Sequence, residues 1–254
     1  MLLYKGERFL DKIVVKYARS GNHPMKLRIL YFLITKWFKN GLILRVPSGR
    51  LFLIKGPDVI QYHLLVKGGY ELETLNLINS ILTTSGSRKT YLDIGGNIGL
   101  TTFAVKTDDV DVFTFEPVYK NFAHLYANYK VNKYPVNIKL LNVGLSDKSG
   151  FVTISNDSDT NNGSFAVNRN YNLKDMIDEH TIYLTTLDDF ITEYRITEIE
   201  LIKMDVEGFE MNVVKGYRMI DTVVANNIIM EFTDLIERTG FSKQDILQYF
   251  HEKG

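Results

Sequence analysis

A loop with three glycines and an acidic residue carries the strongest chemical signal in the sequence. Residues 93–99 read Asp-Ile-Gly-Gly-Asn-Ile-Gly and stand between a strand-like stretch and a helix-like stretch. Glycines at such a turn let the backbone pass close to a ligand and let the next element pack tightly against the strand. Glu116 ends the next strand-like stretch, where a carboxylate can bind both hydroxyls of a ribose. Together these features predict a site for a nucleoside-containing ligand.

The spacing of the glycines indicates which ligand this is. A dinucleotide-binding loop has the pattern G-x-G-x-x-G, whereas here Asn97 stands where the second glycine would be. The acidic residue before the glycines suits a cationic amino group, and the loop lacks the lysine of a phosphate-binding loop. S-adenosylmethionine has both a ribose and an amino-acid end. We expect it to be bound by Asp93, Gly95, Asn97, Gly99 and Glu116, with a plain strand–helix turn as the alternative for the glycines.

A second group of charged residues follows an apolar, β-branched run at 199–204. This strand would lie beside the strand that precedes the glycine loop, which places Asp205 next to the cofactor. Methyl transfer requires an aligned acceptor and removal of the acceptor proton. Asp205 and Glu207 are therefore the candidate catalytic residues. Salt bridges or helix capping are the alternative for Glu207 and the favoured interpretation for Glu210.

The surroundings of Asp205 raise the questions of a buried lysine and of a metal. Lys203 lies in the same strand and needs an acidic partner, for which Glu116 or another acid is a candidate. The equally good alternative is that the lysine reaches the active site. A carboxylate is a weak base toward an aliphatic hydroxyl. A divalent cation held by Asp205 and Glu231 could lower the pKa of that hydroxyl. The histidines show no metal-ligand spacing; His180 is the one to test as a base, although a surface role is favoured for it.

Polar residues after the strand-like run 138–143 are candidates for contact with adenine. They are Asn142, Ser146 and Asp147, which follow the third strand of the predicted sheet, where related folds contact adenine. Serine and aspartate are also common turn residues. A plain turn is therefore an equally good interpretation for Ser146 and Asp147.

The composition excludes several classes of protein. The chain has 254 residues with 30 Lys or Arg and 30 Asp or Glu, and this zero net charge argues against a dedicated nucleic-acid binder. A hydrophobic fraction of 45% and a charged fraction of 24% are globular values. The absence of cysteine excludes disulfides, thiolate metal sites and a cysteine nucleophile. No signal peptide or membrane-spanning stretch is visible, so we expect a cytoplasmic protein.

The elements that must position these residues fall into two regions, predicted at 1–88 and 89–254. The first 45 residues have helical periodicity, with a second helix that starts at His23-Pro24 and ends at Asn40-Gly41. A β-hairpin turning at 47–49 and a helix from Tyr70 complete this region. The polar face of the second helix is basic, which indicates contact with a membrane surface or a partner. A cap packed on the rest of the protein is the favoured interpretation.

Strand-like and helix-like runs alternate through the second region. The strand-like runs are 91–94, 112–115, 138–143, 199–204 and 228–232, and the helix-like runs are 99–106, 121–131, one beginning at Thr186 and one beginning at Ser242. This alternation predicts an α/β fold with an open, mostly parallel sheet and helices on both faces. A second hairpin, turning at 147–150 into a strand at 151–155, is also predicted.

Residues 156–180 form a long irregular stretch rich in asparagine and aspartate. Loops of this length are usually functional, and these side chains can bind sugar hydroxyls. We therefore predict that this stretch and the N-terminal helices cover the site, hold the acceptor and exclude water, with Gly163-Ser164-Phe165 as hinge and apolar contact. Tyr70 is a further candidate for the acceptor groove. A surface insertion without a role is the alternative.

Five segments together resemble the FkbM-type methyltransferase family. They are Asp-Ile-Gly-Gly-Asn-Ile-Gly at 93–99, Phe-Glu-Pro at 115–117, Gly-Leu-Ser-Asp at 144–147, Thr-Leu-Asp-Asp at 186–189 and Lys-Met-Asp-Val-Glu-Gly-Phe-Glu at 203–210. The resemblance spans 91–232 and implies a Rossmann-like, class I S-adenosylmethionine-dependent methyltransferase. Such enzymes usually act on a hydroxyl oxygen of a sugar, glycan or polyketide-like acceptor. The alternatives are an inactive nucleoside-binding or scaffolding module of the same fold and an NAD-dependent oxidoreductase.

Overall fold

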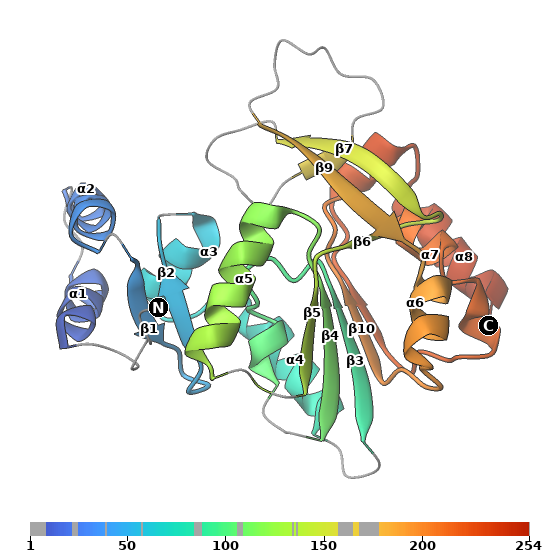
Figure 1. Cartoon of the computed structure of the whole chain (residues 1–254), viewed down its shortest axis with the longest axis horizontal. Helices are drawn as coiled ribbons and strands as arrows, with labels where there is room; N and C mark the ends of the chain where they lie inside the picture. The colour runs from blue at the N-terminus through green and yellow to red at the C-terminus, as the bar shows by residue number, and fades with distance from the viewer. Residues whose placement is uncertain are drawn as a thin grey trace.

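The centre of the molecule is a five-stranded sheet whose neighbouring strands all run parallel. The computed structural model describes residues 9–21, 25–38, 40–56, 58–83, 88–105, 109–133, 135, 137–156, 165–167 and 178–253. The strand order is β11–β10–β3–β4–β5 (Figure 1). The strands are β3 (Lys89–Ile94), β4 (Val110–Phe115), β5 (Ile138–Leu141), β10 (Leu201–Met204) and β11 (Ile228–Met230). The predicted α/β fold and its five strands are confirmed.

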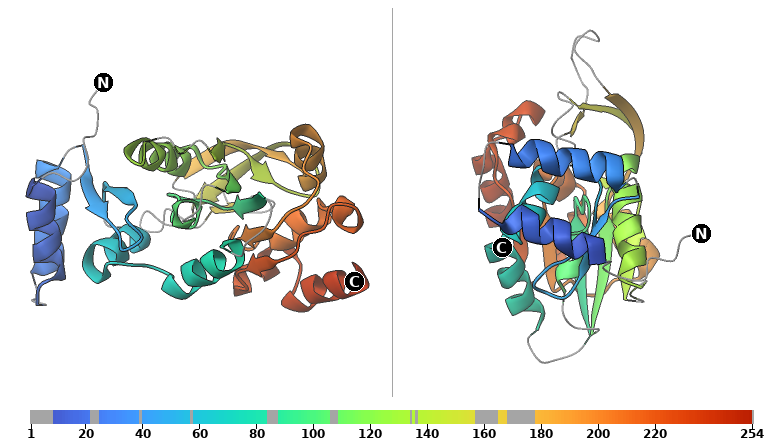
Figure 2. Two further views of the ribbon diagram at one scale, coloured as in Figure 1. Left: turned by 90° about the horizontal axis from the view of Figure 1, so that it is seen from below. Right: turned by 90° about the vertical axis from the view of Figure 1, so that its left-hand side faces the viewer.

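Helices cover both faces of this sheet (Figure 2). They are α4 (Leu72–Leu82), α5 (Tyr119–Val131), α6 (Leu187–Tyr194), α7 (Glu210–Lys215) and α8 (Lys243–Lys253). On one face, Ile78 and Leu82 of α4 share a buried cluster with Tyr91 of β3. On the other face, the ring of Phe190 in α6 lies 5.1 Å from that of Phe113 in β4. The sheet is buried on both sides, which explains its nearly continuous apolar strands.

Two helices begin at the predicted residues because side chains cap their first turns. At α6 the hydroxyl of Thr186 accepts a hydrogen bond of 3.0 Å from the Asp189 N–H. At α8 the Asp245 carboxylate accepts a bond of 2.6 Å from the Ser242 N–H, and the Asp245 N–H donates to the Ser242 hydroxyl at 3.3 Å. Each cap binds backbone groups that have no partner inside the helix.

The N-terminal region consists of two helices, a hairpin and a short helical pair. It contains α1 (Phe9–Arg19), α2 (Lys26–Phe32), η1 (Leu33–Trp37), β1 (Leu42–Arg45), β2 (Leu51–Ile54), α3 (Val59–Tyr62) and η2 (His63–Lys67). The second helical stretch ends before Asn40-Gly41 as predicted, and Gly41 has a φ of +83° at the bend into β1. The hairpin is confirmed, since β1 and β2 pair antiparallel around the turn at 47–49. The start predicted near Pro24 lies outside the described residues.

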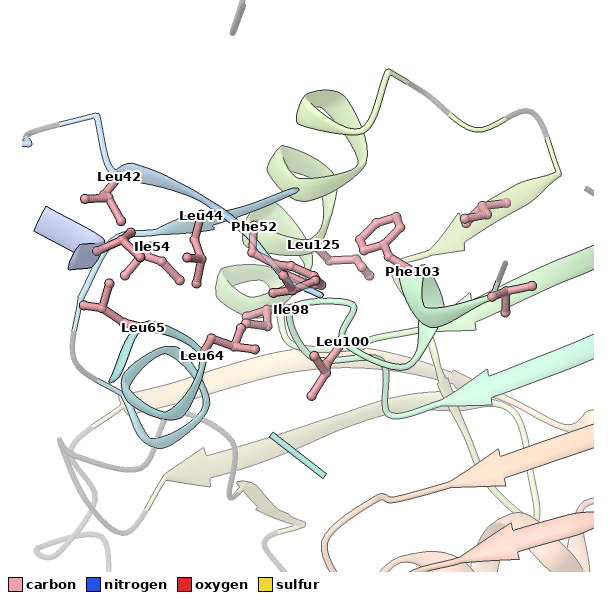
Figure 3. Packing of buried hydrophobic residues seen from close by; sticks show 14 of the residues in the cluster. Leu42, Leu44, Phe52, Ile54, Leu64, Leu65, Ile98, Leu100, Phe103 and Leu125 are labelled. Atoms are coloured by element: carbon pink, nitrogen blue, oxygen red, sulfur yellow. The ribbon is translucent and has the colours of Figure 1, made fainter. Parts of the chain in front are cut away.

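A continuous core joins this region to the sheet domain (Figure 3). Leu44 and Phe52 of the hairpin share a cluster with Ile98 and Phe103, which follow β3. The rings of Phe52 and Phe103 lie 6.1 Å apart in an edge-to-face arrangement. The boundary predicted at residue 88 therefore runs through a shared core, and it stays a prediction.

The predicted second hairpin is wrong. The strands β6 (Gly144–Leu145), β7 (Gly150–Asn156), β8 (Phe165–Val167) and β9 (Asp178–Thr185) form a separate sheet in the order β6–β9–β7–β8. β9 lies between β6 and β7, antiparallel to β7 and parallel to β6. The local turn residues and the alternation specify a strand at β7 but not its partner. That partner, β9, begins 22 positions beyond the end of β7.

The stretch predicted to be irregular, 156–180, is regular at both of its ends, and its role as a cover stays a prediction. β7 extends to Asn156, and β9 begins at Asp178. β8 occupies 165–167 within it. The remaining residues, 157–164 and 168–177, lie outside the described residues, and Gly163-Ser164 is among them.

The helix predicted at 99–106 is also wrong. The loop after β3 continues through turns into a single 3₁₀ turn, η3 (Thr102–Ala104). The hydroxyls of Thr101 and Thr102 donate hydrogen bonds of 2.9 and 2.6 Å to the Asp93 carboxylate. These bonds hold the turn against the end of β3, because short polar side chains compete with regular helical bonding.

Candidate functional site

A cleft lies at the carboxyl ends of β3, β4 and β10. It encloses about 1050 Å³, open solvent at its mouth included. Its polar lining residues are Asn97, Glu116, Asn121, Asp205, Glu207 and Thr239. Ile154, Ile182 and Leu184 of the second sheet provide an apolar wall. In an α/β sheet this edge is where ligands bind, so the cleft agrees with the predicted location.

Glu116 is a buried carboxylate that lines this cleft. Its oxygens accept hydrogen bonds of 2.9 Å from the N–H groups of Asn97 and Val118. Burial raises the pKa of Glu116 to about 7, against hydrogen bonds from these groups and from the Asn121 side chain that lower it. The bond from Asn97 ties the acid to the glycine loop, so the two predicted cofactor features form one structural unit.

The glycine loop can form only because its first glycine has no side chain. Gly95 has a φ of +83°, and a Cβ there would lie 1.8 Å from the carbonyl oxygen of Asp205. Gly99 also has a positive φ, and its added Cβ would lie 2.4 Å from the Phe103 ring. Asn97 adopts a left-handed conformation with a φ of 48°. The loop therefore presses against β10, and this contact brings Asp205 beside it.

Asp93 lies behind the loop and does not line the cleft. Its carboxylate is fully buried and accepts hydrogen bonds from Thr101 and Thr102. The ammonium of Lys203 lies 4.0 Å from it. Asp93 therefore anchors the loop in this structure, and the prediction that it binds the amino end of a ligand stays a prediction.

Lys203 is paired with Asp205, not with Glu116. The Lys203 Nζ atom lies 3.2 Å from Asp205 Oδ2 and also reaches the carbonyl oxygen of Gly95 at 3.4 Å. Burial by itself would lower the pKa of Lys203, but the Asp205 and Asp93 carboxylates outweigh it and hold that pKa above its ordinary value. The lysine is therefore a buried cation that joins the ends of β3 and β10.

Asp205 and Glu231 form a carboxyl pair at the ends of β10 and β11. The Glu231 N–H donates to the carbonyl of Met204 at 3.1 Å, which continues the register of the two strands. Burial opposes ionisation of Asp205, but Lys203 and a hydrogen bond from Glu231 lower its pKa below the ordinary value. Partial burial, this bond and the charges of nearby acids raise the pKa of Glu231 to about 7. Near pH 7 Asp205 is thus ionised, and Glu231 is close to the midpoint of its titration.

The donor set around this pair does not fit a divalent cation. The ammonium of Lys203 occupies one side of the Asp205 carboxylate, and the hydrogen bond from Glu231 engages it further. Within the described part of the chain, no group of three or more His, Asp or Glu side chains is placed to hold a metal. Divalent cations prefer six or more oxygen ligands, so we derive no step through a metal.

Comparison with known proteins agrees with this architecture. The profile of the methyltransferase FkbM domain matches residues 93–254, which begin at the glycine loop and include every element from β4 onward. That match covers more than half of the chain. The chain belongs to the FkbM methyltransferase family. The resemblance inferred from the sequence motifs is thereby confirmed.

Two curated methyltransferases are similar in sequence to this FkbM-family chain. Methyltransferase 1 of Beauveria bassiana is 25% identical over 177 residues, an alignment that covers 59% of this chain and 71% of that protein. Hexuronic acid methyltransferase AglP of Haloferax volcanii is 27% identical over 141 residues, covering 56% and 55%. The chain thus spans about half the length of the archaeal relative.

Solved structures of methyltransferases are also similar to it. Methyltransferase FkbM from Methylobacillus flagellatus has a TM-score of 0.37 at 17% identity, covering 83% of this chain and 44% of that one. The SAM-dependent methyltransferase from Agrobacterium tumefaciens has a TM-score of 0.43 at 10% identity, covering 75% and 51%.

The two glutamates after Asp205 in this family member have different surroundings. Glu207 lines the cleft and adopts a left-handed conformation with a φ of 55°. Glu210 is buried, and its carboxylate accepts bonds of 3.3 and 3.2 Å from the N–H groups of Val206 and Gly208. Glu210 thus fixes the turn before α7, which is a structural role of the kind favoured from the sequence, whereas Glu207 lines the cleft.

The three predicted adenine contacts lie at the margin of the cleft without lining it. The side-chain amide of Asn142 donates hydrogen bonds to the carbonyls of Glu116 and Pro117 at 2.8 and 3.1 Å. The Ser146 hydroxyl donates to the Asp147 carboxylate at 2.9 Å in the turn after β6. These bonds shape the backbone around Glu116, and adenine contact stays a prediction for all three residues.

The remaining candidates lie on other elements. His180 is half-buried in β9, and its role as a base stays a prediction. Tyr70 hydrogen-bonds Glu71 before α4, and the charges of Asp205 and Glu231 reach this pair. Tyr70 itself lines a second, mainly apolar cavity between the hairpin and η3. The side chain of Phe165 lies outside the described residues.

Sequence reasoning missed two contributions to the site. Leu235 and Thr239 of η5 (Asp234–Thr239) line the cleft from the C-terminal side. Glu71 lies near the cleft and, like Asn97 and Glu207, has a left-handed backbone conformation, with a φ of 48°. No local spacing signals either one, because both approach the cleft through chain folding. Glu71 directly follows Tyr70, which is a predicted residue of the acceptor groove, and only that adjacency could have indicated it.

Proposed function

We propose that this protein transfers a methyl group from S-adenosylmethionine to a hydroxyl oxygen of a sugar-containing acceptor. The observation that carries the proposal is Glu116, a buried acid that lines the cleft and is hydrogen-bonded to the glycine loop. A carboxylate at the end of the second strand suits the two hydroxyls of a ribose.

The residues around the cleft have separate tasks in this proposal. The bound cofactor supplies an activated methyl group on a sulfonium. Glu116 holds the ribose and the loop at 95–99 passes beneath the ligand. The apolar wall formed by Ile154, Ile182 and Leu184 excludes water. Asp205, ionised and fixed by Lys203, accepts a hydrogen bond from the acceptor hydroxyl and orients its oxygen.

Proton removal by a carboxylate is sufficient in this reaction because of its timing. As the new C–O bond forms, the hydroxyl oxygen becomes positively charged and its proton becomes strongly acidic. The bond between the methyl carbon and sulfur breaks, its electron pair stays on the sulfur, and the hydroxyl proton moves to Asp205. Glu207 is a further acid that lines the cleft and is proposed to contact the acceptor.

The acceptor class rests on a relative and on the acceptor-side residues. The archaeal relative is a hexuronic acid methyltransferase, 27% identical over 141 residues. The acidic and amide side chains of this cleft are suited to hydroxyl donors. A saccharide acceptor is consistent with both, and methylation of protein or nucleic-acid nitrogen alone would contradict the proposal.

Calorimetry tests the cofactor. The wild-type protein should bind S-adenosylmethionine and its demethylated product in the micromolar range, and Glu116→Ala should abolish this binding. Glu252→Ala, which removes an exposed acid on α8, is the control and should bind normally. Absence of binding to folded protein would overturn the cofactor assignment. Binding of NAD in the same titration would favour an oxidoreductase.

Measurements of methyl-transfer rates test the role of Asp205. Methyl transfer should be measured with a panel of saccharides that contain uronic acids. Asp205→Asn should lower kcat strongly while leaving cofactor affinity within a few-fold of wild type, because its carboxylate acts on the acceptor. Chelation with EDTA should leave the rate unchanged. Normal cofactor binding without transfer to any acceptor would favour the inactive scaffolding module instead.

A further inference from the structure

The outer face of the N-terminal helices carries about half of the exposed large hydrophobic side chains among the described residues. Nineteen large hydrophobic side chains are exposed among all the described residues, and nine of them belong to α1, α2, η1 and the residue before α2. They are Phe9, Leu10, Ile13, Met25, Leu27, Ile29, Tyr31, Phe32 and Trp37. Single exposed hydrophobic residues need no explanation, but such a concentration marks an interaction surface.

These side chains are not needed to attach the helices to the protein. The opposite face of α1 buries Val14, Val15 and Ala18, and that of α2 and η1 buries Leu30 and Ile34 in the shared core. Both helices are therefore apolar on the face that packs inward and again on the face that points outward. They lie side by side as the outermost layer at one end of the molecule (Figures 1 and 2).

The charge on the same face is positive. Lys12, Lys16, Arg28 and Lys36 of these helices are exposed, whereas their acid, Asp11, is fully buried. Residues 1–41 contain nine Lys or Arg and two Asp or Glu, while the rest of the chain contains 21 and 28. The zero net charge of the chain thus conceals a strongly basic end.

We propose that the outer face of the N-terminal helices binds the surface of an anionic lipid bilayer. Exposed aromatic and aliphatic side chains alternating with cations are the features of helices that lie in a membrane interface. No helix in the described part of the chain is long and apolar enough to span a bilayer, so the contact is peripheral. A second copy of the chain is disfavoured as the occupant, because it would bring the same positive charge against this face. This inference does not depend on the proposed methyl transfer.

The single tryptophan makes the contact directly measurable. Trp37 is the only tryptophan of the chain and its side chain is 75% exposed. Mixing the full chain with vesicles of equal phosphatidylcholine and phosphatidylglycerol should shift its emission to shorter wavelength and carry the protein into the vesicle pellet. Vesicles of phosphatidylcholine alone should bind far less, and added salt should weaken binding to the anionic vesicles.

Matched variants separate this face from unspecific adsorption. K12Q combined with R28Q should weaken vesicle binding about 25-fold, since each basic residue near an anionic surface contributes roughly fivefold. F9S combined with F32S should abolish the emission shift. K243Q combined with L247S, which alters exposed residues of α8 at the other end of the molecule, should bind as wild type. Circular dichroism confirms that each variant is folded.

Three results would overturn the proposal. The first is a folded wild-type protein that does not bind anionic vesicles. The second is equal loss of binding in the α8 control variant. The third is a stable dimer in sedimentation equilibrium that F9S with F32S dissociates, which would make a second copy the occupant.

Discussion

Glu116 combines burial with three stabilising hydrogen bonds, and burial dominates. Its carboxylate has an ordinary pKa of 4.5, which burial raises to about 7. Between these values the folded protein binds a proton that the unfolded chain has lost. A group of this kind stabilises the ligand-free protein at low pH, and its contribution disappears as the pH rises through 7.

The first prediction concerns this pH dependence. As the pH rises from about 4.5 to about 7, ionisation of Glu116 should lower the free energy of unfolding by about 3 kcal/mol. Glu116→Gln cannot ionise, so the difference between variant and wild type should change by that amount over the range. Urea unfolding at several pH values measures it. A constant difference would show that the acid is already ionised at low pH. Cofactor affinity should rise with pH over the same range, because a ribose binds the ionised form.

The second prediction concerns Lys203, whose cation serves two acids at once. Lys203→Met leaves the buried Asp93 and the half-buried Asp205 without their counter-charge and should lower the free energy of unfolding by about 3–5 kcal/mol. Urea denaturation measures the loss. Lys243→Met removes an exposed pair with Asp234 and should leave stability nearly unchanged. Similar small losses in both variants would show that the buried charges have found other partners.

At the scale of elements, the glycine loop and β10 are fitted to each other by one backbone contact. The third prediction compares two glycines with nearly equal φ, Gly95 at +83° and Gly49 at +87°. Gly49→Ala meets no atom within 4 Å and should cost only the left-handed conformation, about 1 kcal/mol. Gly95→Ala also collides with the carbonyl of Asp205 and should cost about 3 kcal/mol. Thermal and urea unfolding measure both, and equal costs would contradict the close packing.

Elements were predictable where their signal is local. The five parallel strands and the caps at Thr186 and Ser242 follow from apolar runs and capping residues, and the structure has them at those places. The pairing of β7 with β9 and the 3₁₀ turn after the glycine loop were not predictable. The first depends on a strand that begins 22 residues beyond the end of β7, and the second on side-chain bonds to Asp93.

At the scale of the whole molecule, the N-terminal hairpin is bonded into the sheet domain. The Asn128 side chain of α5 accepts a hydrogen bond of 2.8 Å from the Leu53 N–H and donates one of 2.8 Å to the carbonyl of Ile98. A single buried amide thus joins β2, α5 and the glycine loop. Together with the shared core, this bridge makes the hairpin part of the structure that supports the site.

The fourth prediction tests this integration. In native-state hydrogen exchange, the Leu53 amide of the hairpin and the Val112 amide of β4 should exchange through the same global opening. Asn128→Ala should lower the free energy of that opening by about 3 kcal/mol, because it leaves buried backbone groups without partners. An opening of Leu53 at much lower free energy than Val112 would instead show that residues 1–88 unfold as a separate unit.

The sequence by itself determined the fold class, the loop at 93–99 and the places of Glu116 and Asp205. These are local features: apolar runs form strands, glycines mark the tight turn, and parallel strands bring their carboxyl ends to one edge. Only the tertiary structure decided that Lys203 pairs with Asp205 and Asp93, and that Asp205 meets Glu231. These contacts depend on strand order, register and side-chain direction, which residues far apart in the chain set together. The burial that gives Glu116 its pKa has the same origin, because it comes from elements packed around the acid and not from its sequence neighbours.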